Sequence, residues 1–183
     1  MNQIKLVGLT TVFFSLIAFG QTTQKNIQSD ISSDWKTIDE SGFTIQYPDS
    51  LELNKSGQMG MTFILLTKQT SQQDLFRENV NLIIQDLAGQ NINLDKYVEI
   101  SERQIKTMIT NGNIIESKRI KTSDSEFQKV IYTGVLGQFN LKFEQYYWIV
   151  KQKAYVLTLT CEINQFDKYQ EIGEKIMNSF KIK

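Results

Sequence analysis

Histidine is absent from this sequence of 183 residues, and cysteine and proline occur once each. Without histidine, the usual Ser-His-Asp and Cys-His forms of nucleophilic catalysis are excluded, and the commonest protein ligand of zinc and copper is missing. A single cysteine cannot form a disulfide within the chain, so the fold has to be stabilised by packing alone. We therefore expect a protein that is not an enzyme, with no catalytic, metal or cofactor site.

An excess of charge of either sign is missing too. Twenty basic residues balance twenty acidic ones, and a chain this close to neutrality has no electrostatic attraction for nucleic acid or for an anionic membrane. The glycine-rich motifs that hold nucleotide phosphates, GxGxxG and the Walker loop, are also absent. We expect no nucleic-acid partner.

The first twenty residues have the pattern of a secretory signal. Lys5 precedes the apolar run 6–18, which ends in the sequence AFG at 18–20. This run of about 13 residues is shorter than the roughly 20 that a membrane-spanning helix needs, so cleavage before Gln21 is favoured over a membrane anchor. Cleavage removes one lysine and no acid, which leaves 19 basic and 20 acidic residues, a net charge of −1. The expected product is periplasmic or secreted and is not inserted in a membrane.

Residues 21–33, QTTQKNIQSDISS, are polar and are predicted to be a flexible N-terminal tether. From 34 to 183 no internal repeat, low-complexity block or second boundary is visible. This length is enough for one domain with its own core. We expect residues 34–183 to be that domain, and the protein to be a monomer.

The single proline follows a strand pattern. In GFTIQYPDS, Phe43, Ile45 and Tyr47 alternate with polar residues, which is typical of a strand with one buried face. Pro48 cannot donate to a sheet ladder and is predicted to end this strand. A strand at DWKTID precedes it, and MTFILLTK (61–68), apolar on both faces, is predicted to be a central strand.

Two segments change to helical spacing, with apolar residues every three or four positions at 94–109 and 166–180. Asn93 and Asn164 are the expected caps, and Asn111-Gly112 is expected to end the first helix. The remaining predicted strands are 79–87, 114–121, 127–137, 141–150 and 154–163, and the short turns between the last three predict an antiparallel meander.

The longest strands carry apolar residues on both faces. In LKFEQYYWIV (141–150), Tyr147 and Ile149 share one face, while Tyr146 and Trp148 share the other. A sheet with water on one side would not have this pattern. The predicted fold class is α+β: an antiparallel β-sheet with helices packed on both faces, an α-β-α sandwich.

This order of elements resembles the PsbP-like family and its bacterial DcrB-like relatives over roughly residues 35–183. The matching segments are GFTIQYPDS, LDKYVEISERQIKTMI, YTGVLGQFNLKFEQYYWIVKQKAYVLTLTC and FDKYQEIGEKIMNSFKI. The resemblance implies a PsbP-like fold, opened by the F-x-I-x-Y-P strand, and an extracytoplasmic, non-enzymatic protein. The lipidated cysteine of the lipoprotein members and the metal-proximal histidines of some photosynthetic members are missing, so no metal ligand is carried over.

Tyr146 and Trp148 are the candidate interaction patch. Aromatic rings at such positions commonly pack beneath a helix. The alternative is that they line a cleft or a docking surface for another protein, because tyrosine and tryptophan offer a large rigid area with a polar group.

Three functions fit these observations. The first is an exported, non-catalytic binding domain that docks to an unidentified envelope or secreted protein. The second is a carrier of a small apolar ligand in a cleft between helix and sheet. The third is a carboxylate-based hydrolase, which would need two acids converging in a concave pocket, one of them desolvated enough to keep its proton near neutral pH.

Cys161 generates the first testable prediction. In AYVLTLTCEI it shares a strand face with Tyr155, Leu157 and Leu159, so its thiol lies on the apolar side, where thiols are unreactive. We predict that native protein resists a mild thiol reagent under conditions that fully label the urea-unfolded chain. Rapid labelling of Cys161 in the native protein would contradict this structural role.

Overall fold

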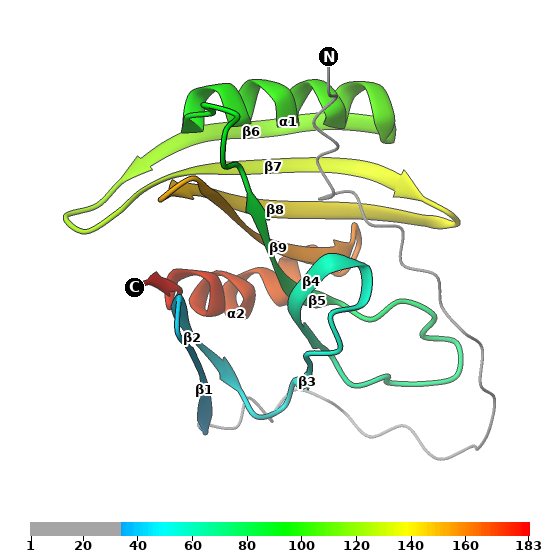
Figure 1. Ribbon diagram of the computed structural model, residues 1–183. Coiled ribbons are helices and arrows are strands. Elements are labelled where there is room, and N and C mark those ends of the chain that lie inside the picture. Colours follow the sequence, from blue (N-terminus) through cyan, green and yellow to red (C-terminus); the bar gives the residue numbers. More distant parts are fainter. Residues whose placement is uncertain (1–33) are drawn as a thin grey trace.

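The computed structural model describes residues 34–183, and the predicted signal (1–20) and tether (21–33) lie outside this range (Figure 1). Within it, two helices, ten strands and one short 3-10 turn (Gln58–Gly60) form a seven-stranded and a three-stranded sheet, both antiparallel. Neither helix is long and apolar enough to span a membrane. The predicted α+β class is confirmed.

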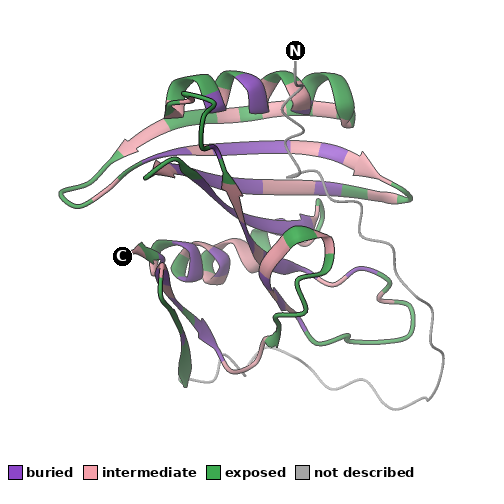
Figure 2. Ribbon diagram, viewed as in Figure 1, coloured by how far each residue is buried: buried purple, intermediate pink, exposed green. Residues whose placement is uncertain are grey.

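The large sheet contains the predicted meander. Its strands, in spatial order, are β3 (Glu52–Asn54), β4 (Met61–Leu66), β5 (Asn79–Asp86), β9 (Lys153–Glu162), β8 (Phe139–Val150), β7 (Glu126–Leu136) and β6 (Thr110–Lys121). The strand predicted to be central, β4, lies one place from the edge, beside the three-residue β3. The interior positions belong to β5, β9, β8 and β7, and Figure 2 shows long buried stretches along these strands.

Helix α1 (Leu94–Met108) covers one face of this sheet and α2 (Phe166–Asn178) the other, as Figure 1 shows in green and red. Asn93 caps α1 as expected, because its side chain accepts a hydrogen bond from Lys96 N at 2.9 Å. Helix α1 ends at Met108, before the expected stop at Asn111-Gly112, and β6 begins at Thr110. Gly112 lies within β6, where a Cβ would be 2.0 Å from Ile105 O, so a larger residue would not fit. Gln165 rather than Asn164 precedes α2, without a side-chain cap.

The F-x-I-x-Y-P strand does not join the large sheet. It is β2 (Phe43–Pro48), which pairs with β1 (Trp35–Glu40) and β10 (Lys181–Ile182) in the three-stranded sheet. Pro48 is the last residue of β2, as predicted. Sequence alternation identifies a strand but does not identify its partner, so this separate sheet was not predicted.

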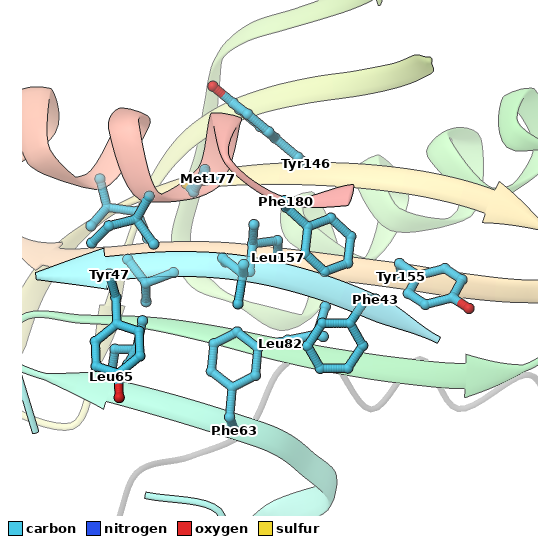
Figure 3. Close-up of a cluster of buried hydrophobic side chains, with 14 of the residues drawn as sticks. Phe43, Tyr47, Phe63, Leu65, Leu82, Tyr146, Tyr155, Leu157, Met177 and Phe180 are labelled. Atoms are coloured by element: carbon cyan, nitrogen blue, oxygen red, sulfur yellow. The ribbon is translucent and has the colours of Figure 1, made fainter. Parts of the chain in front are cut away.

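The three-stranded sheet and α2 together close one face of the large sheet. Figure 3 shows the ring of Phe43 next to those of Phe180 and Phe63, and the ring centroids of these two pairs are 5.6 and 6.0 Å apart. Ser179 joins the two covers because Gln46 N donates to its Oγ at 2.8 Å. Each large apolar side chain buried here contributes about 1.5–3 kcal/mol.

A buried ion cluster lies in the same interface. Glu144 of β8 is fully buried, and its Oε1 lies 2.9 Å from Nζ of Lys129, which also donates to Glu174 of α2 at 3.0 Å. Neither Glu144 oxygen has a well-aligned hydrogen bond to another described residue, so the lysine contact is mainly electrostatic. Burial raises the pKa of Glu144 above its ordinary value although Lys129 acts to lower it.

Close contact between α2 and β9 depends on Gly173. A Cβ at this position would lie 2.6 Å from Leu159 Cδ2 and 2.9 Å from Cδ1. Alanine would gain about 1 kcal/mol of helix propensity, but overpacking a buried contact costs about 1–3 kcal/mol. We predict that Gly173→Ala lowers the free energy of unfolding by about 1 kcal/mol in urea titrations, whereas the exposed Glu171→Ala changes it by less. A more stable Gly173→Ala protein would contradict the tight contact.

The ion cluster predicts a pH-dependent effect of Lys129→Met. A raised folded-state pKa of Glu144 means that protonation favours the folded state, so this contribution is present at low pH and is lost as pH rises through the folded pKa. Removing Lys129 raises that pKa further and leaves an uncompensated buried charge at neutral pH. We predict that Lys129→Met costs about 3 kcal/mol of unfolding free energy at pH 7.5, and much less at pH 4.

Two further variants control this experiment. Lys175→Met removes an exposed lysine whose partner is Glu171, so it should cost little at either pH. Adding Glu144→Gln to Lys129→Met removes the buried charge and should restore most of the loss at pH 7.5. Equal destabilisation by Lys129→Met at both pH values would show that Glu144 does not titrate in this range.

Candidate functional site

The two faces of the large sheet are not covered to the same extent. One face lies under α2 and the three-stranded sheet, while the other is covered by α1, which packs over β6, β7 and β8. Beside α1, a cavity of about 250 Å³ remains on this second face. We call this cavity the hollow.

The walls of the hollow are mostly apolar. They come from the large sheet, from the chain before β5, and from the end of α1: Met61, Ile64, Phe76, Ile83, Met108, Ile109, Tyr132, Val135, Leu136, Leu141 and Phe143. Met108 at the end of α1 is 65% exposed, so this part of the lining reaches the surface. Phe76 is held by Phe139, with ring centroids 5.2 Å apart. Apolar walls of this kind favour an apolar ligand body.

A group of polar side chains interrupts these walls. Asn81, Thr158 and Gln145 lie side by side across β5, β9 and β8, because Asn81 pairs with Thr158 and Thr158 pairs with Gln145. Asn79 and Thr160 form the next pair along β5 and β9. All five line the hollow. We call these five residues the polar row.

Hydrogen bonds hold part of the polar row in place. Gln145 Nε2 donates to Thr158 Oγ1 at 3.0 Å, and Tyr147 donates its hydroxyl to Gln145 Oε1. Asn81 Nδ2 donates to Asn79 Oδ1 at 3.2 Å. Because unpaired polar groups are costly to bury, these bonds stabilise an otherwise unfavourable arrangement.

The hollow is electrically neutral. None of the described residues that line it has a carboxylate, ammonium or guanidinium group. Its one ionisable side chain, Tyr132, is buried, and burial raises the pKa of that phenol far above neutral pH. A cavity without a countercharge disfavours a charged ligand, because an ion would lose its hydration without compensation.

The residues expected to form the interaction patch lie elsewhere. Tyr146 and Trp148 share one face of β8, as alternation predicted. That face lies on the α2 side, and the two residues are only 3% and 6% exposed. Both rings contact Phe127, and the indole Nε1 donates to Ser125 Oγ at 2.9 Å. These two residues therefore belong to the closed core and present no open patch in this structure.

None of the described acids lines the hollow, so the hollow is not the concave acid site that the hydrolase alternative requires. Glu78, whose pKa is raised by burial and by the nearby Asp74 and Glu162, also lies outside it. Glu144 and Glu174 meet through Lys129 inside the α2 interface, and neither lines the hollow. Burial acts to raise the pKa of Glu174, but the contact with Lys129 and the hydrogen bond from Gln170 outweigh it and lower that pKa. Within residues 34–183, no three Cys, Asp or Glu side chains gather in a way that could hold a metal ion.

Cys161 is also part of the closed core. Its side chain is fully buried on the α2 side of β9, in the cluster that contains Leu157 and Leu159. Burial is the main reason that the pKa of its thiol is raised. Its predicted position on the apolar face is thus confirmed.

The alternating pattern in AYVLTLTCEI already indicates a polar stretch at the position of the hollow. It places Thr158 and Thr160 opposite Leu157, Leu159 and Cys161. Two threonine hydroxyls on the inner face of a central strand indicate a stretch of that face that is not covered by an apolar element. Asn79, Asn81 and Gln145 could not be added from the sequence, because strand register decides which residues stand beside these threonines.

Neither the known protein-family models nor the curated proteins give a match to this chain. Solved structures do. The cyanobacterial PsbP protein CyanoP from Synechocystis sp. PCC 6803 superposes with a TM-score of 0.61 at 13% identity, covering 86% of this chain and 99% of that one. LpqN of Mycobacterium tuberculosis, which is involved in cell envelope biogenesis, gives 0.62 at 11% identity, covering 81% and 90%.

A third similar structure is PA94 from Pseudomonas aeruginosa, a protein of unknown function. Its TM-score is 0.54 at 11% identity, and the match covers 79% of this chain and 94% of that one. Identities this low carry information about the fold and not about function. The chain described here has the PsbP-like fold.

Proposed function

We propose that this protein is an exported, non-catalytic binding domain that takes a small, neutral, largely apolar ligand into the hollow. The observation that carries the proposal is a cavity of about 250 Å³ with apolar walls, a polar row and no charged lining residue. Small-molecule sites commonly combine apolar walls with a few placed polar groups. The proposal favours the carrier function over the hydrolase, because none of the described acids lines the hollow.

Export is part of the proposal. It rests on the signal pattern of residues 1–20. The likeness to LpqN supports it, because that protein is involved in cell envelope biogenesis. A carrier working outside the cytoplasm would have to hold its ligand without a disulfide-stabilised pocket, since the chain has one cysteine.

Docking to an extracytoplasmic protein is the second candidate. Met108 favours it, because an exposed methionine at the rim of an apolar hollow is a suitable contact for a side chain of a partner. The two candidates differ in what fills the hollow. A small solute satisfies the first, whereas the second needs a protein surface around the rim.

A filled-hollow variant tests the proposal. Ile64 lines the hollow and is half-buried, so Ile64→Trp should occupy its space, whereas Thr37→Trp adds the same ring to an exposed site on β1. We predict that the neutral solute 2-naphthol, at ten times its dissociation constant, raises the melting temperature of the wild type by about 3–6 °C. Thr37→Trp should keep this rise and Ile64→Trp should lose it.

The decisive measurement is how the melting temperature changes with the concentration of added solute. An absent shift with 2-naphthol and with a panel of neutral solutes of similar size would contradict ligand binding. An equal shift in Ile64→Trp would mean that the solute binds outside the hollow, which would also contradict the proposal.

A further inference from the structure

We propose that the polar row is a recognition element that selects an uncharged hydroxyl, carbonyl or amide head group and directs it toward β9. This inference rests on the proposed function, because it assumes that the hollow binds a ligand. It adds the chemical class of the ligand and its orientation. Thr158 and Thr160 are the residues assigned to the head group.

The change from apolar to polar along β9 supports this orientation. On the face toward α1, Ala154 and Val156 belong to the cluster under the helix, while Thr158 and Thr160 follow further along the same strand. Thr158 and Thr160 supply neutral hydroxyls and no charged group, so this part of the strand suits an uncharged head group. Along β9, the hydroxyl side chains therefore lie in the part of the strand that α1 no longer covers.

Hydrogen-bond accounting shows that the polar row has unused capacity. Thr158 Oγ1 accepts from Gln145, but its own hydroxyl proton has no acceptor among the described residues. Thr160 is only 7% exposed, and its hydroxyl has no hydrogen-bond partner in the described part of the chain. A hydroxyl can donate one bond and accept others, so each threonine can still serve a ligand.

The row is also held rigidly enough to discriminate between ligands. The Tyr147 ring contacts the Tyr97 ring of α1 edge-on, with ring centroids 5.5 Å apart. The Tyr147 hydroxyl donates to Gln145 Oε1, and Gln145 Nε2 donates to Thr158 Oγ1. Helix α1, acting through Tyr147, thus fixes the Gln145 amide, and this amide positions Thr158. A site built to hydrogen-bond a ligand group discriminates strongly against an analogue that lacks the group, because its buried polar atoms are then left unpaired.

The volume sets the size of the ligand. An apolar cavity of about 150 Å³ is known to hold benzene, so a cavity of about 250 Å³ has room for about ten non-hydrogen atoms. Tyr132 and Phe143, stacked with their ring centroids 4.6 Å apart, supply an aromatic wall. The expected ligand is a compact apolar alcohol, phenol, ketone or amide.

Matched probes test this inference. Naphthalene has the apolar body alone, 2-naphthol adds a neutral hydroxyl, and 2-naphthoate adds a charged head. We expect 2-naphthol to bind wild-type protein about ten times more tightly than naphthalene, and 2-naphthoate to bind more weakly than 2-naphthol. Dissociation constants are measured by fluorescence titration and checked by calorimetry.

Threonine-to-valine variants locate the effect. Thr160→Val and Thr158→Val remove a hydroxyl and keep the branched shape, so each should weaken 2-naphthol about 5- to 10-fold and leave naphthalene unchanged. Thr133→Val on β7, outside the hollow, is the control and should change neither affinity. Melting temperatures of the unliganded variants confirm that they fold.

The outcomes separate the two proposals. If naphthalene and 2-naphthol bind equally and the two variants have no effect, the head-group inference is overturned while ligand binding in the hollow stands. Tightest binding of 2-naphthoate would overturn the neutral head group. If none of the probes binds, both the inference and the proposed function fail.

Discussion

The large sheet is apolar on both faces, and the protein therefore needs two covers for it. On one side, α2 and the three-stranded sheet close over Phe63, Leu82, Leu157 and their neighbours (Figure 3). On the other side, α1 alone packs over Tyr147, Val130 and Tyr132. Because one helix is narrower than a seven-stranded sheet, part of this face stays open, and the hollow is the result.

The composition of β9 matches the cover on each of its two faces. Along β9, the α2 side carries Tyr155, Leu157, Leu159 and Cys161, which are all buried. The α1 side changes from aliphatic residues under the helix to threonines beyond it. Hydrophobic burial stabilises the parts of the sheet under a cover. In the part without a cover, the polar side chains can form hydrogen bonds with each other and with water. The closed face also holds the Lys129 cluster, where two carboxylates share one ammonium.

Most of the fold was predictable because periodicity reports burial directly. The two helices, the Asn93 cap, the end of β2 at Pro48 and the meander all follow from local patterns. The separate sheet formed by β1, β2 and β10 was not predictable, since β10 has two residues and pairing is a long-range property. Alternation likewise placed Tyr146 and Trp148 together on one face of their strand. It gave no information on whether α2 and the small sheet would close over them, and the structure shows that they do.

The unequal covering of the two faces can be measured directly with side-chain methyl NMR. On titration with 2-naphthol, the account predicts chemical-shift changes at the methyl groups of Ile83, Ile109 and Leu141, which line the hollow. The methyl groups of Leu157, Leu159 and Ile176, on the closed face, should stay unchanged. Shifts confined to the closed face, or spread equally over both faces, would contradict the account.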